Sequence, residues 1–437
     1  MQETLTVPVG DVLGLVERIL GRYSGEDCYA YEREGWWYIG IGARAQLSID
    51  PTGTKAAVHS NGERRFQELN GRMAAVARDF VDRHLPKCHR MFGQVGFNYA
   101  AHSRGQTFQP GRWPLLVLMV PKNEIVMCNG VMVVRASDED AAKELRAMAL
   151  GTDLDAKADP TTLPVNLSAD EADYEARVAQ ALAEIAEGAY AKIIISRAIE
   201  LDGAINLAST LCHGRRFNSP ARSFLFKHGC FEAVGFSPEL VMAVKGSQVF
   251  TEPLAGTRRL AEQGDDNARL RHDLQSDAKE IVEHVLSVKA AVEDVSELCT
   301  AESVVIGDFM SIRERGRVQH LGSRVQGTLA EGKDAWDAFD ILFPAITASG
   351  IPKQAALSAI GRLEASPREL YAGAVLFLEE ESRLEAALVL RSVFQDPVRR
   401  WIQAGAGVIA QSMPDRELTE TKEKLGSFTP FLVASHR

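Results

Sequence analysis

Two pairs of glutamates, far apart in the chain, have a spacing that could bring their carboxylates together. Glu280 precedes Glu283 by three residues, and Glu417 precedes Glu420 by the same interval. Residues three apart on a helix share one face, about one turn apart. Each pair alone is typical of a solvated helix face in an acidic chain. Together, four carboxylates could bind one divalent cation, and hard oxygen ligands of this kind suit Mg²⁺.

Lys192 is a candidate general base. It lies in the string AKIIISR, which is typical of a β-strand, and by alternation it shares a strand face with Ile194. A lysine amine in apolar surroundings has a lowered pKa and can act as a base near neutral pH. The strand taken alone favours another reading, a lysine on an edge strand whose amine stays in water and opposes aggregation.

A candidate acid and a candidate anion-binding turn follow. Glu239, in the string GFSPEL, could be a general acid if burial raises its pKa, or it could simply begin a helix and favour the helix dipole. Gly256 and Thr257 lie in PLAGTR, a tight turn whose N–H groups could hold a carboxylate. An ordinary turn is the alternative, and the spacing of a phosphate-binding loop is absent.

Three further residues could contact a ligand. Alternation places Arg391 on an apolar strand face, where it needs either an internal acidic partner or a bound carboxylate. Gly405 belongs to an Ala-Gly-Ala-Gly run, and glycines within a strand mark either close approach of a ligand or a bulge. His320 stands between apolar residues, a setting more typical of a buried structural histidine than of a catalyst.

The elements that must position these residues follow from periodicity and turn signals. We expect helices at 10–23, 169–188, 267–298 and from 415 onward, and strands at 36–42, 114–120, 191–197, 373–378, 384–395 and 401–410. The apolar stripe of the helix at 267–298 includes Val285 and Val288, and Glu280 and Glu283 flank that stripe. Residues 150–168 are predicted to form an exposed connector. The short links between the last strands favour antiparallel pairing. The fold class is therefore α+β, with the connector dividing residues 1–168 from 169–437 within one structural domain.

Composition narrows the functional classes. The chain has 437 residues, 46% hydrophobic and 25% charged, and a formal net charge of -10. No long basic stretch is present, which argues against nucleic-acid binding. The six cysteines are scattered, as expected for reduced thiols in a cytoplasmic protein. The N-terminus does not resemble a signal peptide, and no apolar run approaches membrane-spanning length.

The order of the motifs resembles the chorismate-utilising enzymes, and within them the salicylate synthases of siderophore pathways. The resemblance runs from about 192 to 432 and is weak over residues 1–190, where we assign no site. It rests on the strings KIIISR, GFSPEL, EPLAGTR, SDAKEIVEH, VQHLGS, ITASGIPK, LYAGAV, ALVLRS, AGAGVI and TETKEKL.

The resemblance implies roles for these residues. Lys192 would activate the water that attacks C2 of chorismate, and Glu239 would protonate the departing C4 hydroxyl. Glu283 and Glu420 would be the principal Mg²⁺ ligands, with Glu280 and Glu417 supporting them through water. The residues expected to contact the substrate are Gly256, Thr257, His320, Thr347, Tyr371, Arg391, Gly405 and Lys424, with Arg391 and Tyr371 on the pyruvyl carboxylate.

The resemblance also implies a monomer whose single large α/β domain encloses the site between two antiparallel sheets. The implied activity is Mg²⁺-dependent conversion of chorismate to salicylate and pyruvate through isochorismate, for a siderophore or a related aryl-capped metabolite. An isochorismate synthase that stops after the first step is the main alternative. Amination is disfavoured, because Ala255 occupies the place of a lysine nucleophile used by one aminating branch. A silent chorismate-binding homologue would not need the complete set of acids and bases.

Overall fold

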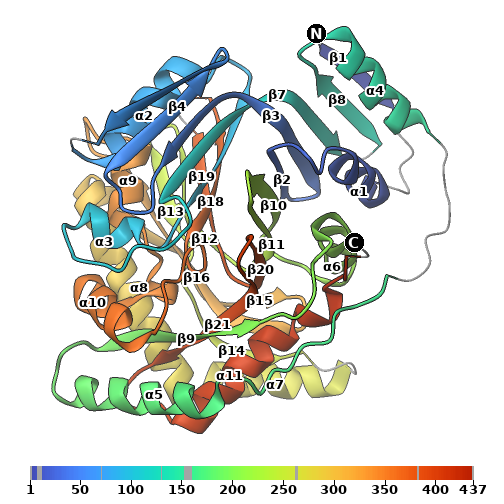
Figure 1. Ribbon diagram of the computed structural model, residues 1–437. Helices are drawn as coiled ribbons and strands as arrows, with labels where there is room; N and C mark the ends of the chain where they lie inside the picture. Colours follow the sequence, from blue (N-terminus) through green and yellow to red (C-terminus); the bar gives the residue numbers. More distant parts are fainter. Residues whose placement is uncertain are drawn as a thin grey trace.

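The computed structural model describes residues 2–6, 12–69, 71–128, 130–151, 160–260, 264–380 and 383–435 (Figure 1). Helices and strands are mixed along the chain, and every strand pairing among these residues is antiparallel. The predicted antiparallel α+β class is therefore confirmed. Residues 152–159 of the predicted connector lie outside the described residues, so the boundary at residue 168 stays a prediction.

Two long strands, β3 (Trp36–Ile49) and β7 (Leu116–Cys128), pair with each other and organise the sheet. The first half of β3 pairs with β2 (Cys28–Arg33), whereas its second half pairs with β4 (Lys55–Ser60). β7 likewise changes partners along its length, from β6 (Arg90–Val95) to β8 (Val131–Arg135). The described strands therefore form one continuous hydrogen-bonded network with two arms, where two separate sheets were expected.

The first arm extends from β3 through β2 and ends at β17. Its further strands are, in order of pairing, β10 (Arg222–His228), β11 (Phe231–Ser237), β20 (Ser392–Gln395), β21 (Arg400–Val408), β9 (Lys192–Glu200) and β17 (Gly350–Ile351). The second arm extends from β7 through β6. Its further strands are β18 (Ala374–Glu379), β19 (Arg383–Leu388), β12 (Leu240–Lys245), β13 (Gln248–Thr251) and β16 (Val318–Thr328), and β16 also pairs with β14 (Leu254–Arg259) and β15 (Val305–Arg315). β1 (Gln2–Thr6) adds to β8, and β5 (Glu63–Glu68) to β4.

Three of the four predicted helices exist, with corrected bounds. The first is α1 (Val12–Arg22), and residues 10–11 of the prediction lie outside the described residues. The predicted helix at 169–188 is α5 (Glu171–Ala186), and the last is α11 (Pro414–Gly426). The α-helices that lie outside the predicted ranges are α2 (Met73–His84), α3 (Tyr99–Ser103), α4 (Glu139–Leu150), α6 (Leu207–Phe217), α9 (Ala335–Leu342) and α10 (Lys353–Leu363). None of the described helices is long and apolar enough to cross a membrane.

The predicted long helix at 267–298 is wrong, because the chain breaks at Asp277. α7 (Gly264–Ser276) ends there and α8 (Ala278–Leu298) begins. The backbone of Asp277 is extended, and its carboxylate accepts hydrogen bonds from two N–H groups of the first turn of α8. This N-cap stabilises the start of a new helix. Glu280 therefore lies in the first turn of α8, where the sequence placed it near the middle of one long helix.

The buried face of α8 also differs from the predicted apolar stripe. Val285, expected inside, is 43% exposed, whereas Glu280 and Glu283, expected beside the stripe, are buried. Apolar spacing misplaced the face because charged neighbours from other elements stabilise the two glutamates inside. α8 consequently turns its glutamates toward the interior of the protein.

The predicted strand at 384–395 is also wrong as one element. β19 ends at Leu388 and belongs to the second arm, whereas β20 begins at Ser392 and belongs to the first. The chain crosses between the arms at residues 389–391, and Arg391 takes a left-handed conformation there, with φ of 51°. Strand alternation does not apply at such a crossing. The prediction that Arg391 lies on an apolar strand face is therefore wrong. The crossing positions Arg391 between the arms instead.

The core consists of two clusters of buried apolar side chains. The larger contains Phe92, Phe377 and Trp401, and the smaller packs α1, α4 and α6 against the first arm. α5 and α11 pack against each other and against β9 and β21, at the lower end of Figure 1. This arrangement fixes α11 next to the strand that carries Lys192.

Candidate active site

One cavity lies where the two arms approach each other, and eleven of the fourteen predicted site residues line it. These are Glu239, Gly256, Thr257, Glu283, His320, Thr347, Tyr371, Arg391, Gly405, Glu420 and Lys424. Gly405 comes from β21 of the first arm, and Gly256, Thr257 and His320 come from β14 and β16 of the second. The other three, Lys192, Glu280 and Glu417, lie directly behind this lining and contact charged residues of the site.

Lys192 is the first residue of β9, a strand with neighbours on both sides. Its side chain is 1% exposed, and Nζ lies 2.9 Å from Oε1 of Glu283. The amine also donates a hydrogen bond to Oγ of Ser287, at 3.0 Å. The edge-strand interpretation of Lys192 is therefore wrong. The prediction of apolar surroundings is also wrong, because the amine of Lys192 forms an ion pair with Glu283.

Gly407, which is not among the predicted site residues, leaves space for this ion pair because it has no side chain. A Cβ at this position would lie 2.2 Å from Oε1 of Glu283 and 3.2 Å from Cε of Lys192. β21 and β9 pair here in unbroken register, so the glycine run is not a bulge. The sequence signal existed in the Ala-Gly-Ala-Gly run, but only the pairing shows which glycine matters.

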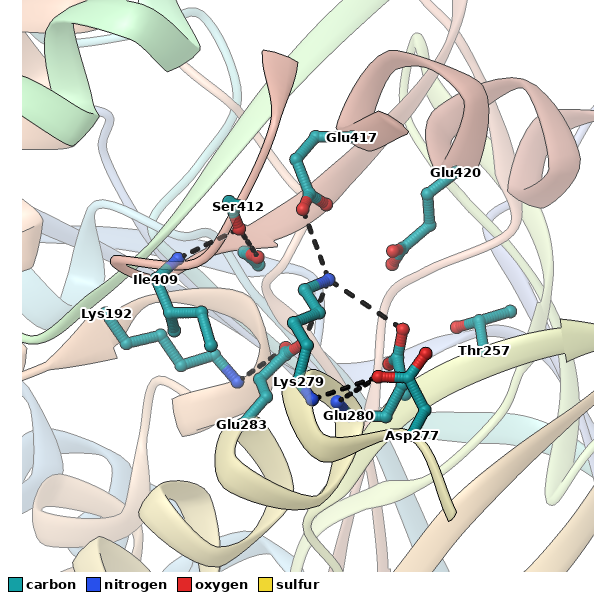
Figure 2. Close-up of polar contacts among 12 residues, drawn as sticks. Lys192, Thr257, Asp277, Lys279, Glu280, Glu283, Ile409, Ser412, Glu417 and Glu420 are labelled. Atoms are coloured by element: carbon teal, nitrogen blue, oxygen red, sulfur yellow. Dashed lines mark hydrogen bonds and ion pairs between the residues drawn. The ribbon is translucent and has the colours of Figure 1, made fainter. Parts of the chain in front are cut away.

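The four predicted metal ligands lie on α8 and α11 (Figure 2), and each lies beside its own cation. The nitrogen-to-oxygen distances are 2.9 Å for Glu283 with Lys192, 3.0 Å for Glu280 with Arg258, 2.6 Å for Glu420 with Lys424, and 3.1 Å for Glu417 with Lys279. Buried carboxylates are costly unless paired, and this cluster satisfies that requirement.

Lys279 is the functional candidate that the sequence reading missed. Its Nζ lies 3.1 Å from Glu417, 3.7 Å from Glu283 and 3.9 Å from Glu280. Burial alone would lower the pKa of Lys279, but the surrounding glutamates, Glu420 foremost, raise it above its usual value. The signal was present as a lysine four residues before Glu283, a common helical pair spacing.

The carboxylates fit a divalent cation chemically. Burial raises the pKa of both Glu280 and Glu417, so a nearby positive charge would stabilise their ionised forms. Oε2 of each is buried with no hydrogen-bond partner among the described residues. Carboxylate oxygens are the donors that Mg²⁺ prefers. Within the described part of the chain, however, no three acidic, histidine or cysteine side chains are already gathered closely enough to hold an ion.

Glu239 is buried at the entrance to β12, so the interpretation as a first-turn helix residue is wrong. Its Oε2 accepts a hydrogen bond from the backbone N–H of Leu254 at 2.9 Å, and Oε1 accepts one from the hydroxyl of Thr347. Burial raises the pKa of Glu239 to about 8, although both hydrogen bonds act to lower it. Glu239 therefore carries a proton at neutral pH, as a general acid must.

Arg391 and His320 connect the two arms across the cavity. Nη2 of Arg391 lies 2.5 Å from Nε2 of His320, and Nη1 donates to the carbonyl of Arg315 at 3.0 Å. A guanidinium only donates, so Nε2 accepts and the imidazole proton lies on Nδ1, 3.0 Å from the carbonyl oxygen of Gly256. Burial, together with Arg391, holds the pKa of His320 well below its usual value, so the ring is neutral.

The charge of Arg391 has no acidic partner among the described residues. Burial and the neighbouring Arg315 lower the pKa of Arg391 to about 10, and it stays charged at neutral pH. A buried cation without a carboxylate favours a bound anion over the alternative of an internal ion pair. His320 is thus both a satisfied buried residue and part of the cavity wall.

Comparison with known proteins gives the same family as the order of motifs, and the similarity covers most of the chain. The profile of the chorismate binding enzyme family matches residues 26–430. A salicylate synthase from Mycolicibacterium paratuberculosis is 39% identical over 419 residues, covering 95% of this chain and 92% of that protein. Anthranilate synthase component 1 from Haloferax volcanii is 36% identical over 258 residues, 58% of this chain and 49% of that protein. The match therefore spans about half of that second relative.

Solved structures share the fold. Anthranilate synthase component I from Streptococcus pneumoniae superimposes with a TM-score of 0.75 at 22% identity, covering 90% of this chain and 92% of that one. The menaquinone-specific isochorismate synthase from Escherichia coli gives 0.74 at 19% identity, covering 99% of this chain and 94% of that one. At these identities the likeness establishes the architecture alone.

Proposed function

Because the chain belongs to the chorismate-binding enzyme family, we propose that it is a Mg²⁺-dependent salicylate synthase. In this proposal it converts chorismate to isochorismate and then to salicylate and pyruvate. The observation that carries the proposal is one cavity lined by Glu239, protonated at neutral pH, and by Glu283, whose buried partner is Lys192. The near full-length similarity to a salicylate synthase supports the second step.

In the first step, Lys192 takes a proton from a water molecule that attacks C2 of the ring. Glu239 gives its proton to the hydroxyl that leaves C4, so one water enters and another departs. Each of these proton transfers typically contributes about 10²- to 10⁴-fold in rate. Thr347 and the N–H of Leu254 orient the carboxyl of Glu239 for this donation.

In the second step, the hydrogen on C2 moves to the methylene carbon of the enolpyruvyl group as the C3–O bond breaks. Pyruvate leaves and the ring becomes aromatic, with no further proton exchange with a side chain. The contribution of the protein is to hold the enolpyruvyl group over the ring. In this proposal Arg391 and Tyr371, which both line the cavity, bind the pyruvyl carboxylate.

Glu283 and Glu420 line the cavity and would hold the metal directly, while Glu280 and Glu417 would support it from behind. Mg²⁺ bound there would supply positive charge for the ring carboxylate of the substrate. Lys424 holds Glu420 at 2.6 Å and donates to the carbonyl of Gly405 at 2.9 Å, which ties α11 to β21. Gly256 and Thr257 close the cavity beside Glu280.

The proposal is tested by incubating purified protein with chorismate and Mg²⁺ and separating the products. Salicylate and pyruvate should both form, and a chelator should stop their formation. Isochorismate alone would identify an isochorismate synthase instead. Binding of chorismate without any turnover would identify a silent homologue.

A further inference from the structure

Lys279 differs from the other three cations of the glutamate cluster. Lys192, Arg258 and Lys424 each pair with a single glutamate of the cluster. Their partners are Glu283, Glu280 and Glu420, in that order. The amine of Lys279 instead lies within 4 Å of Glu280, Glu283 and Glu417 together. Figure 2 shows this amine between the glutamates of α8 on one side and Glu417 of α11 on the other. It therefore lies among three of the four glutamates that would hold or support a shared metal ion.

The position of Lys279 is built into the start of α8. The carboxylate of Asp277 accepts the backbone N–H of Lys279 at 2.9 Å, which fixes the first turn of the helix. Glu417, whose side chain is fully buried, has Lys279 as the cation placed against it. The Lys279 side chain is itself 18% exposed, so its flexible stem has a route to solvent.

Charge balance shows what the amine does. Four carboxylates face four cations, so the cluster is neutral without a metal. A divalent cation would add two positive charges to a buried site that still holds Lys279. Like charges a few ångströms apart in such a site repel strongly. The ring carboxylate of a bound substrate would offset part of this added positive charge.

We propose that the amine of Lys279 occupies the place of the divalent cation and competes with it for the glutamates. Without substrate, Mg²⁺ must displace the Lys279 amine, and this displacement costs free energy. When the dianionic substrate binds with Mg²⁺, its negative charge offsets that free energy. Lys279 thus makes Mg²⁺ binding weak before chorismate arrives and strong afterwards, and by linkage chorismate binding gains equally from Mg²⁺. This inference rests on the proposed function, since it takes chorismate as the dianion.

The direct test is calorimetric titration of Mg²⁺ into the full-length protein without substrate. Lys279→Met should bind Mg²⁺ at least about fivefold more tightly than the natural chain, the lower end of typical coupling between ligands. Lys289→Met is the matched control, because it removes an exposed lysine of the same helix and should leave Mg²⁺ affinity unchanged. Equal or weaker binding by Lys279→Met would overturn the inference, as expected of a residue that merely organises the site.

A second titration includes chorismate, in a Glu239→Gln background that removes the proposed acid and blocks turnover. Chorismate should strengthen Mg²⁺ binding more in the chain that keeps Lys279 than in Lys279→Met. An equal gain in both would overturn the inference while leaving the metal site intact. Absence of Mg²⁺ binding in every variant, with and without chorismate, would instead refute the metal site of the proposed function. Lys279→Gln, which keeps a polar side chain, replaces the methionine variant if the latter does not fold.

Discussion

The amine of Lys192 and the carboxylate of Glu283 form one buried ion pair, with Nζ 2.9 Å from Oε1. The residue proposed as the base and a residue proposed as a metal ligand are therefore in direct contact. β9 supplies the first and α8 the second, so the relative position of these two elements sets the geometry of both proposed roles. A change at either residue will affect the other.

Lys192→Ala should abolish isochorismate formation from chorismate, with a loss of at least about 10²-fold, the lower range for a proton-transfer group. The assay follows isochorismate, salicylate and pyruvate together. Isochorismate supplied directly should still yield salicylate and pyruvate, because the second step needs no base. A near-normal rate with chorismate would show that Lys192 is not the base.

Gly407→Ala should slow turnover of chorismate, because the new methyl group would meet Oε1 of Glu283 at 2.2 Å. Overpacking of this kind typically costs about 1–3 kcal/mol of folding stability, so a lower Tm should accompany the slower turnover. Gly361→Ala is the control, since a Cβ on that helical glycine of α10 would contact nothing within 4 Å. If both variants keep full activity, the Lys192–Glu283 contact tolerates displacement and does not set the rate.

Glu239→Gln should change how stability depends on pH. The pKa of Glu239 is raised from 4.5 to about 8 in the folded chain, so the folded state binds its proton more tightly than the unfolded state. That contribution to stability is complete below pH 4.5 and is lost as pH rises toward 8. The variant lacks this titration, so its Tm relative to the natural chain should increase between about pH 5 and 8 and then level off. A difference in Tm that is constant across this range would contradict the buried, protonated state.

Glu420→Gln should raise the Mg²⁺ concentration needed for half-maximal activity, because a neutral amide is a weaker ligand than a carboxylate. We expect a shift of at least about tenfold, within the range seen when support of a metal site is removed. Glu423→Gln makes the same charge change on the same helix, outside the cluster, and should leave the Mg²⁺ titration unchanged. An unchanged titration for Glu420→Gln as well would remove Glu420 from the ligand set.

Local patterns predicted much of the framework. The strand with Lys192, the helices α5 and α11 and the antiparallel class all follow from short-range periodicity and short links, and the structure confirms them. Eleven predicted site residues line one cavity, although their chemical roles stay proposals. The motif order supplied that set, because the spacing of single residues favoured ordinary structural interpretations for most of them.

The errors lie where distant neighbours decide the conformation. Nothing local shows that β19 and β20 belong to different arms, yet that crossing positions Arg391. The glutamates of α8 face inward because cations from β9 and β14 lie there, which helical spacing cannot reveal. Local spacing shows only the pairing of Lys279 with Glu283, whereas its contact with Glu417 on α11 appears only in the fold.

The central claim is tested most directly with chorismate that carries deuterium at C2, incubated with the protein and Mg²⁺ and followed over time. Salicylate and pyruvate should appear in equal amounts, and the deuterium should move into the methyl group of pyruvate. Isochorismate that accumulates with its deuterium retained, without pyruvate, would contradict the claim that both steps occur in this cavity.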